Sequence, residues 1–116
     1  MAKKIMVVDD DPAIVRYLTS LFENNGYVTC SATDGSKAFS VFESEEPDLI
    51  TLDLEMPEEW GPQFYRKLMK KKRRKVPVIV ISGLSSNKYS IADAAAIISK
   101  PFDANQVLAA VKQVIG

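Results

Sequence analysis

Short apolar runs alternate along the chain with stretches in which apolar residues recur at helical spacing. A continuous apolar run such as Ile5–Val8 is typical of a strand that is covered on both faces. Runs of this kind predict five strands, over residues 5–8, 27–32, 48–52, 76–81 and 95–98. Helical spacing predicts helices after the first, second, third and fifth runs, and the first carries Ile14, Leu18, Leu21 and Phe22 on one face.

Local signals mark where the predicted elements begin and end. Asp11 suits the N-cap of the first helix and Pro12 its first helical position. The sequence Asn-Asn-Gly at 24–26 predicts the end of that helix. Asp-Gly at 34–35 predicts a turn, and EMPEEWGP at 55–62 predicts a loop before the third helix.

The order of these elements predicts the fold class. Repeated strand–helix units favour a parallel sheet with right-handed crossovers. The 116 residues are too few for an eight-fold barrel, which takes about 250 residues. We therefore predict one α/β domain over residues 1–116, with a doubly wound five-stranded parallel sheet of flavodoxin-like order 2-1-3-4-5. Few apolar residues recur at helical spacing between residues 82 and 94, so we expect a shortened fourth helix there.

The composition narrows the classes of protein. The 15 basic and 15 acidic residues cancel, which gives no reason to expect direct nucleic-acid binding. The basic run at 70–75 is interpreted as a solvated helix end. The chain contains no histidine, which excludes a histidine-based triad, and its single cysteine, Cys30, is expected to be buried and inert. No apolar run is long enough for an export signal or a membrane span, so we expect a cytoplasmic protein without membrane insertion.

Polar residues stand at the ends of the predicted strands. Asp9 and Asp10 follow the first strand, Asp53 the third, Ser82 the fourth and Lys100 the fifth. The carboxyl ends of parallel strands share one edge of the sheet, and ligands bind where the strand order reverses. Three carboxylates at that point repel one another unless a cation intervenes, and an oxygen-only cluster suits Mg²⁺ or Mn²⁺. With the hydroxyl and the ammonium added, the set predicts a site that handles phosphoryl groups.

These motifs give the chain a recognisable resemblance. VVDDDP, DLITLDLEMP followed by Gly61, VPVIVIS and SKPF extend from Lys4 to the final helix. In this order, each at a strand end, they resemble the receiver domain of two-component response regulators, including the chemotaxis regulators. The resemblance implies that Asp53 accepts a phosphoryl group from a histidine kinase or a histidine phosphotransfer protein. A downstream protein target or output domain would then respond, and a homodimer is one arrangement that such receivers form.

The resemblance also implies roles for the other strand-end residues. Asp10, Asp53 and the backbone carbonyl of Glu55 would bind the metal directly, with Asp9 acting mainly through water. Lys100 and the Ser82 hydroxyl would contact the phosphoryl oxygens. The Lys100–Pro101 peptide bond resembles one that is often cis in the family.

The sequence departs from the family pattern in the part that receivers commonly use to pass the signal to a partner. Ile97 occupies the position where receivers commonly carry an aromatic switch residue. The stretch from Ser82 to Lys100 is also about one helical turn shorter than is usual. We therefore expect intact phosphorylation chemistry together with a non-standard choice of partner or dimer mode.

Three other functions remain open at this point. One is a receiver-like module that binds a protein without being phosphorylated, against which Asp9, Asp10, Asp53 and Lys100 argue. Another is a small phosphatase of the haloacid-dehalogenase type, which also uses an aspartate nucleophile but carries a second catalytic aspartate where this chain has Glu55. The third is a flavin binder of flavodoxin type, for which the phosphate-binding loop after the first strand is absent.

Overall fold

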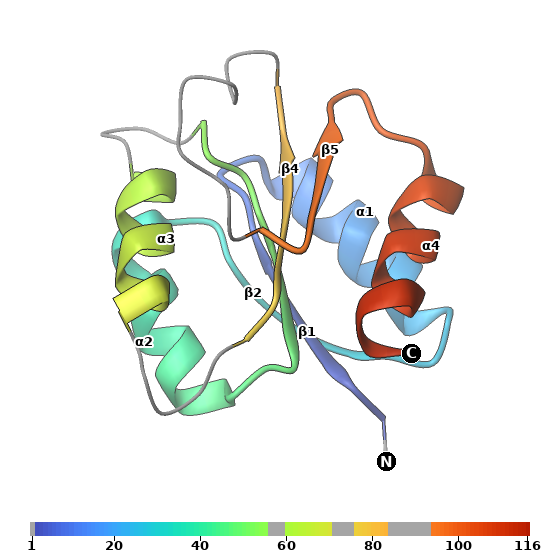
Figure 1. Ribbon diagram of the computed structural model, residues 1–116, viewed down its shortest axis with the longest axis horizontal. Helices are drawn as coiled ribbons and strands as arrows, with labels where there is room; N and C mark the ends of the chain where they lie inside the picture. Colours follow the sequence, from blue (N-terminus) through green and yellow to red (C-terminus); the bar gives the residue numbers. More distant parts are fainter. Residues whose placement is uncertain (1, 56–59, 71–75, 84–93) are drawn as a thin grey trace.

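The computed structural model describes residues 2–55, 60–70, 76–83 and 94–116. Its strands form one five-stranded sheet in the order β2-β1-β3-β4-β5, and every neighbouring pair is parallel. Figure 1 shows this arrangement, in which β1 lies centrally between β2 and β3. The predicted fold class and strand order are therefore confirmed. The strands are β1 (Lys4–Val8), β2 (Val28–Ala32), β3 (Leu49–Leu52), β4 (Val78–Ser82) and β5 (Ala96–Ser99).

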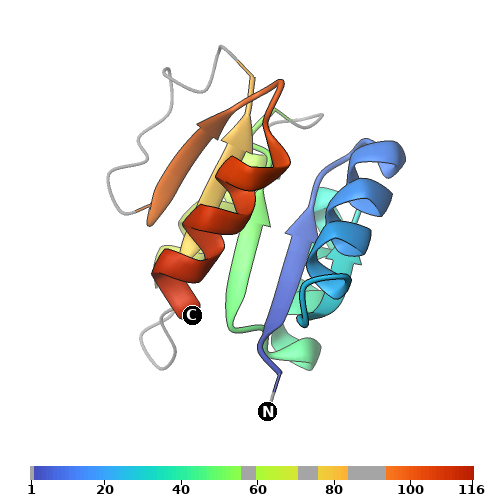
Figure 2. The ribbon, with the colours of Figure 1, turned by 90° about the vertical axis from the view of Figure 1, so that its right-hand side faces the viewer.

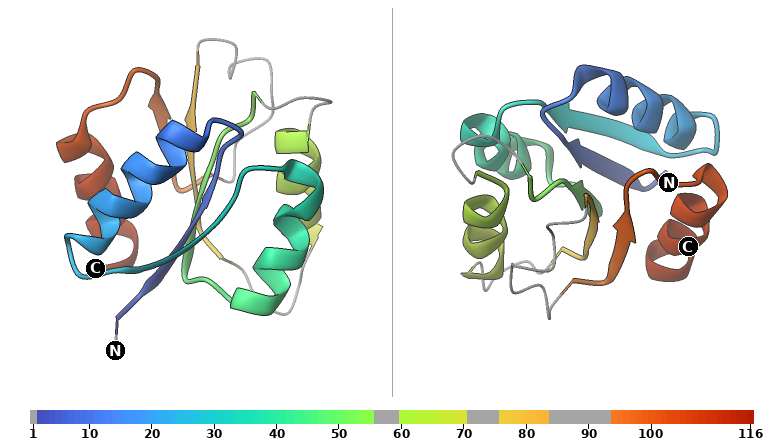
Figure 3. Two further views of the ribbon diagram at one scale, coloured as in Figure 1. Left: turned by 180° about the vertical axis from the view of Figure 1, so that it is seen from behind. Right: turned by 90° about the horizontal axis from the view of Figure 1, so that it is seen from above.

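Helices cover both faces of the sheet. In Figures 1 and 3, α2 and α3 lie on one face, and α1 and α4 lie on the other. Each face therefore has its own apolar cluster, one containing Phe42 and Phe64 and the other containing Phe22 and Val111. The central strands β1 and β3 are buried between these clusters, as their continuous apolar sequences predict. The helices are α1 (Pro12–Glu23), α2 (Gly35–Glu45), α3 (Trp60–Lys70) and α4 (Ala104–Ile115).

Aspartate caps begin three of these helices. The carboxylates of Asp11, Asp34 and Asp103 accept hydrogen bonds from the backbone N–H two residues further on, at 2.9, 2.8 and 2.9 Å. Each cap satisfies an N–H group that has no partner within its helix, and so stabilises the start of that helix. The predicted cap at Asp11 and the first helical position of Pro12 are confirmed. The predicted turn at 34–35 was wrong, because Asp34 caps α2 and Gly35 is its first residue.

Two further predictions need correction. The loop predicted over 55–62 is too long, since α3 already begins at Trp60. Cys30, which was expected to be buried, is only half-buried on the edge strand β2. The shortened fourth helix, predicted between β4 and β5, falls on residues 84–93, and most of the basic run falls on 71–75. Both segments lie outside the described residues.

The strand register brings the carboxyl ends of the strands together. Val8 pairs with Leu52, and the Asp53 N–H donates to the Val8 carbonyl at 3.0 Å. Ser82 pairs with Ser99, and the Lys100 N–H donates to the Ser82 carbonyl at 2.8 Å. Figure 2 shows the strands ending together at the upper edge of the sheet. No helix among the described residues combines the length and apolar content needed to cross a bilayer.

Candidate functional site

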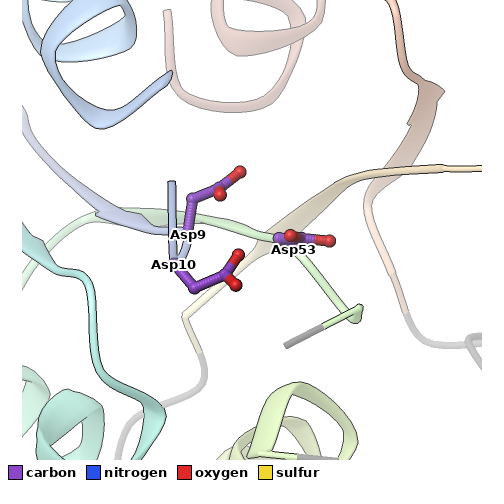
Figure 4. A group of neighbouring side chains, drawn as sticks. All are labelled: Asp9, Asp10 and Asp53. Atoms are coloured by element: carbon purple, nitrogen blue, oxygen red, sulfur yellow. The ribbon is translucent and has the colours of Figure 1, made fainter. Parts of the chain in front are cut away.

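Three carboxylates meet where the strand order reverses. Asp9 and Asp10 follow β1, and Asp53 follows β3, so that one carboxylate oxygen from each lies within 4.8 Å of the others. Figure 4 shows the carboxyl groups of Asp9 and Asp10 pointing toward the side on which Asp53 lies. Asp9 and Asp53 are only 2% and 4% exposed, whereas Asp10 is exposed. The predicted convergence of these residues is confirmed.

Lys100 supplies a positive charge inside this cluster. Its Nζ lies 2.9 Å from Asp9 Oδ2 and 3.3 Å from Asp53 Oδ2. The lysine comes from the end of β5, and its cis peptide bond to Pro101 agrees with the sequence-based expectation. Because two buried carboxylates share one ammonium, Asp9 and Asp53 are held close together.

Hydrogen-bond donors converge on Asp53 from the other side. The buried Ser82 hydroxyl donates to Asp53 Oδ1 at 2.9 Å, and the Glu55 N–H donates to the same oxygen at 2.9 Å. Asp53 is thus contacted by a hydroxyl, an amide and an ammonium. Asp9 accepts from Lys100 and from the Asp11 N–H, the latter at 2.9 Å.

Burial and charge shift the titration of the two partners in the ion pair. Burial raises the pKa of Asp9, and the hydrogen bonds from Lys100 and the Asp11 amide only partly oppose this rise. Burial alone would lower the pKa of Lys100, but the carboxylates of Asp9 and Asp53 outweigh it and raise that pKa above 10.5. Burial thus opposes ionisation of Asp9, whereas the two neighbouring carboxylates favour the charged form of Lys100. We regard the pair as ionised, because the ammonium lies at hydrogen-bond distance from the Asp9 carboxylate.

The donor set fits a hard divalent cation. All three side chains offer carboxylate oxygens, which is the ligand type that Mg²⁺ prefers. Lys100 neutralises only part of their charge. None of the described residues donates a hydrogen bond to the Asp10 carboxylate, which leaves that group available to a metal at the exposed side of the cluster. The acidic triad is therefore consistent with a Mg²⁺ site.

One residue beside the cluster was not predicted from the sequence. Gly83, directly after Ser82, lies against the Glu55 side chain, and a Cβ at position 83 would overlap Glu55 Oε1. The signal available in the sequence was a glycine immediately after a strand-end hydroxyl. Ile97, at the position of the usual switch aromatic, lies on β5 and is 51% exposed.

Comparisons with known proteins agree with this geometry. The family model described as "Response regulator receiver domain" matches residues 5–112. Protein Rrf1 from Nitratidesulfovibrio vulgaris is 34% identical over 116 residues, which cover 99% of this chain and 84% of that protein. The chain spans only 48% and 49% of two other relatives, both described as transcriptional regulators.

Solved structures show the same likeness. The signal receiver domain of a response regulator from Bermanella marisrubri has a TM-score of 0.89 and 28% identity, with 100% of both chains covered. The response regulator TrrA from Thermotoga maritima, in complex with Mg²⁺-BeF, has a TM-score of 0.87 and 30% identity, covering 97% of this chain and 99% of that one. The chain therefore belongs to the response regulator receiver domains of two-component systems, which interact with histidine kinases and are not turnover enzymes.

Proposed function

We propose that the chain is a phosphorylation-controlled signalling receiver whose acceptor is Asp53. The phosphoryl donor is a phosphohistidine on a histidine kinase or a histidine phosphotransfer protein. One observation carries this assignment: of the three clustered carboxylates, only Asp53 is contacted by both Ser82 and Lys100 among the described residues. A phosphoryl group on Asp53 would therefore meet a hydroxyl donor and an ammonium at once.

The proposed transfer is a single in-line displacement. A carboxylate oxygen of Asp53 attacks phosphorus, a P–O bond forms, and the P–N bond to the donor imidazole breaks. The electron pair of that bond returns to the imidazole nitrogen, which then takes a proton. Lys100 and Ser82 hold the phosphoryl oxygens while charge builds on them. Hydrolysis later releases phosphate and restores the carboxylate when water attacks phosphorus.

We propose that the metal is held by the residues that the resemblance to receiver domains implies. Asp10, Asp53 and the backbone carbonyl of Glu55 would bind Mg²⁺, or Mn²⁺ in its place, with Asp9 acting mainly through water. When bound, the ion would neutralise charge on the phosphoryl oxygens. The TrrA structure, which contains Mg²⁺-BeF, supports the choice of ion.

We further propose that residues 1–116 act as one receiver unit that passes the signal by a conformational change. The recipient would be a downstream protein or an output domain, with a homodimer as one form of the response. The chain matches about half of two transcriptional regulators, which supports a recipient outside the matched part. With the exposed Ile97 on β5, the coupling to that recipient would use an element other than an aromatic switch.

Acid-quenched intact mass spectrometry tests the chemistry. The protein is incubated with acetyl phosphate and Mg²⁺, alongside Asp53→Asn and a sample containing a chelator. We expect one phosphoryl group on the wild type and none in either control. If the wild type gained no phosphoryl group and did not respond to beryllofluoride, the phosphorylation-independent protein-binding function would replace this proposal. Continuous turnover of a small phosphate ester would instead indicate a phosphatase.

A further inference from the structure

A hollow lies between α2 and α3, on the face of the sheet opposite α1 and α4. Figures 1 and 3 show the two helices side by side on that face. The hollow has a volume of about 230 Å³, and none of the residues that line it belongs to the acidic cluster. Both helices contribute to its lining, which consists of Gly35, Ser36, Phe39, Gln63, Phe64 and Lys67.

Two aromatic rings form the apolar part of this hollow. Phe64 is only 2% exposed, and the half-buried Phe39 packs edge-on against it, with the ring centroids 6.5 Å apart. Phe39 also packs against Phe42, at a centroid distance of 5.8 Å. Because this packing holds the rings in place, an apolar group that entered the hollow would meet a surface that is already formed.

Lys67 supplies a positive charge above this aromatic surface. Its Nζ lies 5.4 Å from the centroid of the Phe39 ring, which is within the range of a cation–π contact. The lysine is exposed, and no carboxylate among the described residues lies within ion-pair distance of its ammonium. The ammonium is therefore positioned by an aromatic ring and can still bind an anionic partner.

The charges around the hollow favour an acidic partner. Every charged residue of α3 is basic and exposed: Arg66, Lys67 and Lys70. On α2, the carboxylate of Asp34 is engaged at the start of the helix, where it accepts hydrogen bonds from the N–H and the hydroxyl of Ser36. Glu43, the first acidic residue within α2, is not among the residues that line the hollow.

We propose that the hollow between α2 and α3 is a docking site for an acidic segment of a partner protein, one that carries an apolar side chain beside a carboxylate. The apolar side chain would pack on the rings of Phe39 and Phe64, and the carboxylate would pair with Lys67 Nζ. The volume of about 230 Å³ lies below the range of about 300–1,000 Å³ for sites that enclose a free ligand, which favours a side chain of a partner. This docking does not require phosphorylation.

Chemical-shift perturbation of the isotope-labelled protein tests the proposal. The probe is a capped peptide with a leucine between two glutamates, added without Mg²⁺ or a phosphoryl donor. We expect saturable shifts at the amides of Ser36, Phe39 and Lys67, with a Kd on the order of 1 mM, because a short flexible peptide loses freedom on binding. The same peptide with glutamine in place of glutamate should bind about three- to fivefold more weakly, because it cannot form the ion pair.

Substitutions locate the two parts of the site. Lys67→Met keeps an unbranched side chain over Phe39 but removes the charge, so it should weaken the glutamate peptide about three- to fivefold and leave the glutamine peptide unchanged. Lys112→Met makes the same change at an exposed lysine of α4, on the other face of the sheet, and should bind as the wild type does. Phe39→Leu should weaken both peptides, because both would cover that ring.

Each further outcome decides against the proposal in a defined way. Equal binding of the glutamate peptide by the wild type and Lys67→Met would overturn it, and so would the absence of shifts at about 10 mM peptide. Shifts of equal size with inorganic phosphate would indicate a general anion site. Tighter, Lys67-dependent binding of a single-stranded oligonucleotide would indicate a nucleic-acid site. A failure of Asp53 to accept a phosphoryl group would leave this proposal standing, because the peptide is added without a phosphoryl donor.

Discussion

Two lysine-centred clusters lie at opposite edges of the same sheet. At the carboxyl edge, Lys100 contacts Asp9 and Asp53, whose side chains are 3% and 4% exposed. At the amino edge, Lys4 Nζ lies 3.0 Å from Glu45 Oε1, and the Glu45 side chain is 44% exposed. The residue types and distances are similar, so burial of the acidic partners is the main difference between the clusters.

Because of this difference in burial, the two ion-pair clusters have different consequences for stability and ligand binding. An exposed ion pair contributes about 0–1 kcal/mol to stability, because water screens it and both side chains lose freedom. The ion pair of Lys4 therefore adds only a little stability at the start of β1. The Lys4 N–H there also donates a hydrogen bond to the Asp48 carboxylate at 2.8 Å. Buried carboxylates are costly without a cation. The Lys100 cluster therefore keeps concentrated negative charge in place for a ligand that can neutralise it.

The largest expected effect comes from removing each lysine in turn. Lys100→Met leaves Asp9 and Asp53 buried without a counter-charge, so the free energy of unfolding without metal should fall by about 2–4 kcal/mol. Lys4→Met should lower it far less, because water screens the ion pair between Lys4 and Glu45. Urea unfolding of the two variants and the wild type, each in chelator, measures both values. Equal losses would contradict the distinction between the clusters.

Mg²⁺ should stabilise the carboxyl-edge cluster alone. A ligand that binds only the folded state at 100 times its Kd adds about 2.7 kcal/mol, so saturating Mg²⁺ should raise the Tm of the wild type. Asp10→Asn should lose most of this rise, because its exposed carboxylate is a proposed ligand. Glu45→Gln, with the same change of charge at the other edge, should keep it. A rise retained in Asp10→Asn would remove Asp10 from the metal site.

Cys30 reports on the environment of the edge strand. Burial, with a smaller contribution from Glu45, raises the pKa of its thiol from 9.0 to about 11. The folded protein then keeps a proton between pH 9 and 11 that the unfolded chain has lost, so stability falls as the pH rises through that window. Since alkylation requires the thiolate, the rate with iodoacetamide should have its midpoint near pH 11 in the folded protein and near 9 in urea.

Only one cysteine is present, so the alkylation signal has a single source. Cys30→Ala should show a flatter fall in stability over the same range of pH. A folded-state midpoint at the ordinary value of 9.0 would show that the thiol is not shielded.

The smallest expected change in stability comes from removing the exposed ion pair between Lys4 and Glu45. Glu45→Gln removes the partner of Lys4 Nζ and should lower the free energy of unfolding by about 0.2–1 kcal/mol at low salt. At about 1 M salt the screening length falls to about 3 Å, and most of the difference should disappear. Urea unfolding at the two salt concentrations measures it. A loss that persists at high salt would mean that Glu45 stabilises the fold by packing.

The sequence predicted the strand-end residues well because their placement follows from topology. In a parallel sheet, Asp9, Asp53 and Lys100 must reach the same edge once their strands are identified. The edges of helices were less predictable: Asp34-Gly35 suits both a turn and a helix start, and Trp60 begins a helix inside a segment with the composition of a loop. The contact between Glu55 and Gly83 joins two loops across the sheet edge, and no local pattern encodes it.

The most direct test locates the phosphoryl group among three neighbouring aspartates. After phosphorylation with acetyl phosphate and Mg²⁺, borohydride reduces an acyl phosphate, so that the aspartate which carried it becomes homoserine. Peptide mapping by mass spectrometry then identifies the residue. We predict homoserine at position 53, with Asp9 and Asp10 unchanged. Homoserine at position 9 or 10 would contradict the assignment of Asp53, because neither Asp9 nor Asp10 contacts the Ser82 hydroxyl among the described residues.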